Sequence, residues 1–65
     1  MLNFVCYRNE QIIKKFPINE LSYITSIISG PNEGQLRVVY RPKKYQVHTI
    51  FADKLQIEEN ESENN

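Results

Sequence analysis

Residues 2–7 form a short run of strand-forming side chains in which both alternating sets contain apolar members. A strand that is apolar on both faces is typical of the centre of a sheet. After a polar break over residues 8–11, the apolar run at residues 12–16 predicts an antiparallel partner. Pro17 ends this second strand because proline has no backbone N–H to donate. The first third of the chain therefore predicts a hairpin, although no Asn-Gly or Asp-Gly pair fixes its turn type.

The spacing of apolar residues becomes helical after this hairpin. Asn19 is a favourable N-cap, and apolar residues follow at intervals of three and four over residues 21–28. The Gly-Pro pair at residues 30–31 is a strong stop signal. The pattern predicts a helix over residues 20–29. Its Ile, Ser and Thr residues have weak helix propensity, so we expect it to form only when packed on a sheet.

A period of two returns over residues 35–51 and predicts a second hairpin. Residues 41–44 have the composition of a reverse turn, with proline at the position whose φ it presets. A turn there pairs Tyr40 with Tyr45 and sets the register of the whole hairpin. Residues 52–57 are expected to extend the returning strand or to form a short additional one.

These elements predict an α+β domain of order ββαββ over residues 1–57, a small antiparallel sheet with one helix across it. The polar and acidic residues 58–65 predict a disordered C-terminal tail. The second apolar face of the first strand needs cover, either from a partner copy or from a sheet that curls closed on itself. The predicted core consists of Leu2, Phe4, Cys6, Ile12, Phe16, Leu21, Ile24, Ile28, Leu36, Val38, Val47 and Phe51.

Composition argues against catalysis. The 65 residues include one His, one Cys, two Gly and no Trp, so most catalytic constellations lack their parts. Cys6 has no partner for a disulfide and reads as a small buried hydrophobe, and no ligand set has metal-binding spacing. We therefore expect a protein that is not an enzyme and that uses no cofactor or metal. A domain this small has marginal stability, which favours a homodimer.

The N-terminal residues do not form a targeting signal. They lack a charged segment followed by an apolar one, and no apolar run in the chain approaches the roughly 20 residues that span a bilayer. The expected location is the cytoplasm, without membrane attachment.

Charge is segregated along the chain. Residues 34–52 contain four Lys and Arg residues and no acid, whereas residues 53–65 contain five acids and one Lys. The predicted register places the basic side chains on the outer face and at the tip of the second hairpin, beside exposed β-branched residues. The candidate partner-binding residues are Arg37, Val39, Arg41, Lys43, Lys44, Tyr45, His48 and Ile50.

Three functions fit this pattern. Because Arg and Tyr often anchor protein contacts, the first is a small non-catalytic protein-binding module, such as a phage or mobile-element inhibitor or regulator of a larger host enzyme, with an acidic surface as its partner. The second is a nucleic-acid-binding protein whose basic hairpin contacts phosphates, although no known nucleic-acid motif is present. The third is a solvated face whose lysines guard the hairpin against aggregation.

Overall fold

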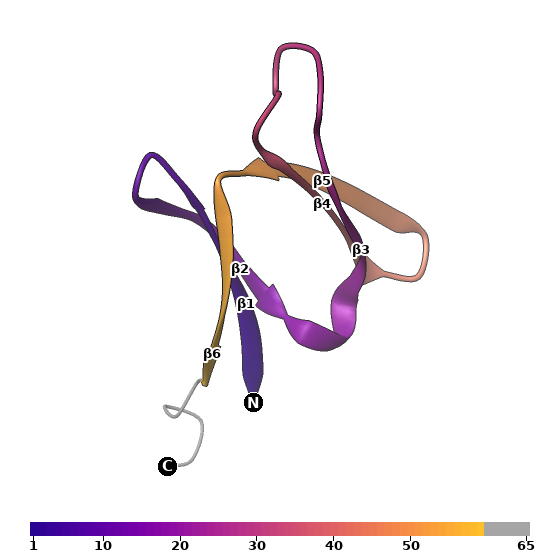
Figure 1. Cartoon of the computed structure of the whole chain (residues 1–65). Coiled ribbons are helices and arrows are strands. Elements are labelled where there is room, and N and C mark those ends of the chain that lie inside the picture. The colour runs from indigo at the N-terminus through magenta and orange to yellow at the C-terminus, as the bar shows by residue number, and fades with distance from the viewer. Residues whose placement is uncertain (60–65) are drawn as a thin grey trace.

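The chain folds as two antiparallel sheets of three strands each (Figure 1). The computed structural model describes residues 1–59. One sheet has the order β2-β1-β6 and the other β3-β4-β5. The elements are β1 (Leu2–Arg8), β2 (Gln11–Pro17), the 3-10 turn η1 (Ile18–Glu20), β3 (Leu21–Ser26), β4 (Leu36–Lys43), β5 (Gln46–Ala52) and β6 (Lys54–Glu59). Since the described residues contain no α-helix, the prediction of an α+β fold of order ββαββ is wrong.

β1 is the central strand of the first sheet, as its two apolar faces predicted. Val5 and Cys6 are neighbours whose side chains point to opposite faces of the sheet, and both are buried within the single chain. Of the two kinds of cover that the sequence left open, a partner copy or further parts of the same chain, the second is sufficient for this strand.

The turn between β1 and β2 consists of Asn9 and Glu10, both with positive φ, at 54° and 66°. Two successive residues of this conformation match a type I′ turn, whose twist suits an antiparallel hairpin. The pairing shifts by one residue between Cys6 and Tyr7, and Ile13 is the additional residue in the bulge.

Residues 21–26 form the strand β3 where the sequence predicted a helix. The branched and hydroxyl side chains that weaken a helix fit a half-buried strand well. Ile24 pairs with Val38, and Leu21 pairs with Tyr40. The central strand β4 thus finds backbone partners on this side, which a helix could not have supplied because its own hydrogen bonds are internal.

The second hairpin is displaced by three residues from the predicted register. Val38 pairs with Ile50 instead of Val47, and Tyr40 pairs with His48 instead of Tyr45. Because side chains alternate along a strand, a displacement by an odd number turns the opposite set of β5 side chains toward the core.

The displacement is accommodated at Pro42, which lies within β4 and not in the turn. The pairing shifts between Tyr40 and Lys43, so that Pro42 occupies a bulge where its missing N–H breaks no ladder bond. The chain reverses later, at Lys44 and Tyr45, after Lys43 has paired with Gln46.

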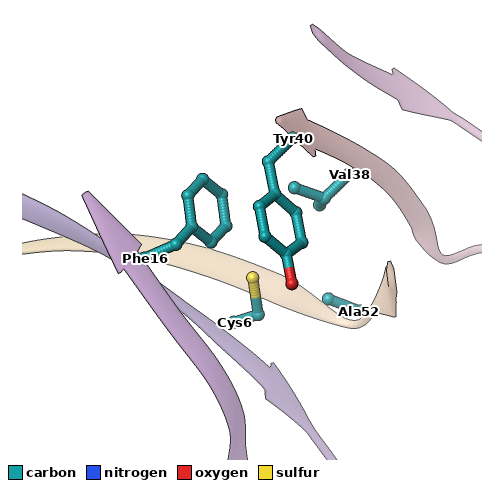
Figure 2. Close-up of a cluster of buried hydrophobic side chains, with 5 residues drawn as sticks. All are labelled: Cys6, Phe16, Val38, Tyr40 and Ala52. Atoms are coloured by element: carbon teal, nitrogen blue, oxygen red, sulfur yellow. The ribbon is translucent and has the colours of Figure 1, made fainter. Parts of the chain in front are cut away.

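The core lies between the two sheets, and both contribute to it (Figure 2). Cys6 and Phe16 come from the first sheet, and Val38, Tyr40 and Ala52 from the second. The Phe16 and Tyr40 rings are stacked, with centroids 4.4 Å apart and planes 11° apart. In Figure 2 the Tyr40 hydroxyl is directed between Cys6 and Ala52.

The predicted core is confirmed in part. Cys6, Phe16 and Val38 are buried, and Phe4, Leu21 and Leu36 pack against them. Phe51 is half-buried on the opposite face of its sheet. The remaining predicted core residues, Leu2, Ile12, Ile24, Ile28 and Val47, are exposed.

Asp53 forms the corner between β5 and β6. Its carboxylate accepts hydrogen bonds from the backbone N–H of Asn9 at 2.7 Å and from Gln35 Nε2 at 3.1 Å. Its own N–H donates to the carbonyl of Tyr7 at 2.7 Å. One side chain thereby ties the β1–β2 turn and the loop before β4 to the junction of the two sheets.

β6 continues to Glu59, so that it includes the first two residues of the predicted tail. Glu58 accepts from Lys15 Nζ at 3.0 Å, and Glu59 accepts from the N-terminal ammonium at 3.2 Å. Residues 60–65, the rest of the predicted disordered tail, lie outside the described residues. Over residues 1–59, the chain has no helix with the length and apolar character needed to cross a membrane.

Candidate binding surface

The predicted site residues fall into three groups in the structure. Arg37, Val39 and Arg41 alternate along β4 on the side away from the core. Lys43, Lys44 and Tyr45 form the tip of the β4–β5 hairpin. His48 and Ile50 point to the core side, because the displaced register places them opposite Tyr40 and Val38. The structure thus brings six of the eight together and separates the other two.

The side of the second sheet away from the core, the outer face, combines apolar and basic side chains. Val39 lies at its centre with 5% of its surface exposed, between Tyr23 and Thr49 in the paired strands. Tyr23 and Val47 are 50% and 58% exposed. By strand alternation, the outer face comprises Tyr23, Thr25, Arg37, Val39, Arg41, Val47, Thr49 and Phe51.

Within residues 1–59, the outer face carries positive charge and no carboxylate. The only acid between Leu21 and Ala52 is Glu33, in the loop between β3 and β4. The Arg37 guanidinium lies over the Phe51 ring, 5.8 Å from its centroid. Arg41 is held toward the hairpin turn, since its Nη2 donates to the Lys44 carbonyl at 2.9 Å. Both guanidiniums are therefore positioned before any partner arrives.

The hairpin tip extends this surface. Tyr45 is 88% exposed, and Lys44 Nζ lies 5.5 Å from the centroid of its ring. Lys43 and Lys44 are also exposed. The tip thus adds two ammonium groups and one aromatic ring beyond the edge of the outer face.

His48 lies on the core side of the second sheet, opposite Tyr40. Its ring lies 5.3 Å from that of Tyr40, tilted by 42°. No hydrogen bond from residues 1–59 orients its imidazole, and a general base needs a group to orient it and one to activate. Over the same residues, no three His, Cys, Asp or Glu side chains are grouped so as to hold a metal ion.

The outer face also contains Tyr23, Val47 and Phe51, which are absent from the predicted binding residues. The predicted register places Val47 and Phe51 in the core, and the predicted helix contains Tyr23. The consecutive strand-forming residues Tyr23, Ile24 and Thr25 were the available signal for a strand.

The geometry therefore describes a sheet face of aromatic, branched and basic side chains. The chain was compared with known proteins at three levels. No protein-family model, no curated protein and no solved structure matches it.

Proposed function

We propose that this chain is a small non-catalytic binding module that attaches to an acidic surface of a larger protein through the outer face and the hairpin tip. The observation that supports this is the gathering of exposed Tyr23 and Val47 with Arg37 and Arg41 on one face that has no carboxylate. Tyr and Arg are enriched among the residues that dominate protein interfaces. A partner that is a host enzyme would make the module an inhibitor or a regulator.

Nucleic acid is the alternative ligand, because cations and aromatic rings also bind single strands. That mode requires free ring faces for base stacking. Arg37 lies over the Phe51 ring, so Tyr23 on the outer face and Tyr45 at the tip are the rings left open to a base. The exposed branched side chain of Val47 suits an apolar protein contact better.

The test begins with the partner captured from a lysate and then purified, so that binding rates are measured with two defined proteins. Replacing Arg37 and Arg41 together by Glu should weaken binding by about tenfold or more, mainly through a slower association rate. The matched control is Lys54→Glu, because Lys54 lies on the other sheet. Equal losses in both variants, or none in either, would contradict the proposal.

The same measurement separates protein from nucleic acid. A nucleic-acid ligand would give a steep linear fall of log affinity with log salt, a similar loss for all sequences, and a flatter slope in the double variant. With a protein partner, the double variant should lose affinity mainly through a slower association rate.

A further inference from the structure

A cleft of about 350 Å³ opens between β2 and β5, away from the outer face. This volume lies near the lower end of the roughly 300–1,000 Å³ of ligand pockets. Three basic side chains line it, Arg8, Lys14 and His48, together with the consecutive residues 48–51 of β5. Four successive residues of one strand can all line a cleft when the edge of that strand forms its wall.

That wall is an unpaired strand edge. β5 pairs with β4 on one side only, and on its other side the Arg8 guanidinium donates to the Phe51 carbonyl from Nε at 3.1 Å and Nη2 at 2.7 Å. Backbone groups of alternate residues point to the same side of an antiparallel strand. The N–H and C=O of Thr49 therefore point into the cleft with Phe51, and no described residue bonds to them.

Within residues 1–59, the basic side chains of the cleft form no ion pair. Lys14 Nζ lies 5.9 Å from the centroid of the Tyr40 ring, and the His48 ring lies 5.3 Å from the same centroid. No carboxylate lines the cleft, and none within residues 1–59 forms an ion pair with Lys14. The neighbouring Lys15, on the opposite face of β2, pairs with Glu58. The two adjacent lysines thus differ, and only Lys14 is open to an external anion.

We propose that this cleft binds an extended acidic segment of the partner, which adds a strand to the free edge of β5 and places a carboxylate against Lys14 and His48. Strand addition uses backbone hydrogen bonds for affinity, while side-chain pockets select the sequence. The carboxylate would form charge-assisted contacts in a cleft without competing acids. This inference rests on the proposed function, since it specifies a segment of the same protein partner.

The experiment is an NMR titration of the whole, isotope-labelled protein with a capped peptide, Thr-Val-Glu-Val-Thr. We expect the largest amide shifts at residues 48–51 and slower hydrogen exchange of the Thr49 N–H. The matched peptide with Gln in place of Glu should bind about tenfold more weakly. Of two peptides N-methylated at alternate residues, one should lose binding, because strand addition uses every second N–H.

Variants of the protein locate the carboxylate contact. The double variant Lys14→Gln, His48→Gln should bind the Glu peptide about tenfold more weakly than the unaltered protein. The Lys15→Gln variant should bind it with unchanged affinity. Equal affinity of the Glu and Gln peptides, full binding by both methylated peptides, or no binding up to millimolar concentration would each overturn the inference. A short oligonucleotide that displaces the peptide and binds more tightly at residues 48–51 would overturn it as well.

The test of the cleft can fail without a failure of the proposed function, because the two proposals concern different surfaces. The Arg37→Glu, Arg41→Glu protein should bind the peptide normally, because both residues lie on the outer face. Peptide shifts confined to Tyr23, Arg37 and Val47 would remove the cleft site and leave the outer face as the binding surface.

Discussion

The Tyr40 ring lies face to face on the Phe16 ring, and this pair joins β4 of one sheet to β2 of the other. Phe4 extends the group, with its ring centroid 5.6 Å from that of Phe16. Few other side chains are fully buried between the sheets. The stability of so small a core should therefore depend strongly on these aromatic residues.

Replacing Phe16 by Ala should destabilise the protein severely. Loss of a buried aromatic side chain costs about 3–5 kcal/mol, through lost burial and the cavity left behind. Chemical denaturation followed by circular dichroism measures this change. The control is Ile12→Ala in the same strand, where a side chain that is 51% exposed should contribute much less. Similar losses in the two variants would show that the stacked pair does not control folding.

Replacing Asp53 by Ala should destabilise the protein at neutral pH and have little effect in strong acid. The backbone N–H of Asn9 and then the Gln35 side chain hold the pKa of Asp53 below its ordinary value of 3.8. A lowered folded-state pKa stabilises the fold fully above pH 3.8, and this stabilisation disappears as the pH falls through the folded value. Thermal melts at pH 7 and near pH 2 measure the difference between the two proteins.

The control for Asp53 is Glu33→Gln, which changes one carboxylate of the loop before β4. Its melting temperature should differ from that of the unaltered protein by a similar amount at both pH values. A gap between the Asp53→Ala and unaltered proteins that is as large near pH 2 as at pH 7 would contradict the role of the ionised carboxylate.

The sequence predicted some strands well because their signals are local. The apolar runs at residues 2–7 and 12–16 predicted β1 and β2, and the two-faced pattern of β1 predicted its central position. The prediction for residues 21–26 was wrong because helical spacing and strand propensity conflicted there. The segment became a strand because it pairs with β4, the next strand along the chain.

The register of the second hairpin could not be predicted from the turn sequence alone, because it also depends on which side chains reach the core. Pro42 fits the second position of a turn, but it also fits a bulge, and both patterns keep Val38 and Tyr40 facing the core. The choice is made by Ile50 and Ala52, which reach the core opposite Val38 and Leu36 only in the observed register. Consequently the basic residues of β4 were predicted on the correct face of the sheet, whereas His48 and Ile50 were predicted on the wrong face.

Cys6 should react slowly with alkylating reagents in the folded protein. Its side chain is fully buried, and burial raises the pKa of the thiol above its ordinary value of 9.0. Less thiolate and no access both slow the reaction, so iodoacetamide at pH 8 should modify the native protein on the order of 100-fold more slowly than the denatured one. Mass spectrometry follows the product. The control is Cys6→Ala with Ile12→Cys, whose exposed thiol should react quickly in the native state.

Replacing Glu10 by Gly should stabilise the protein. Glu10 has a φ of 66° in the turn between β1 and β2, a conformation that strains a residue with a Cβ atom and that glycine adopts freely. The change also creates the Asn-Gly pair that type I′ turns prefer. The relief of strain should exceed the added flexibility of the unfolded chain and leave a net gain of about 0.5–1 kcal/mol in the free energy of unfolding. Urea denaturation measures the gain.

The control is Gln11→Gly, at the first residue of β2. This change should destabilise the protein by a comparable amount, because glycine there weakens a strand without relieving a positive φ. If both changes destabilise, the turn does not hold Glu10 in the left-handed conformation.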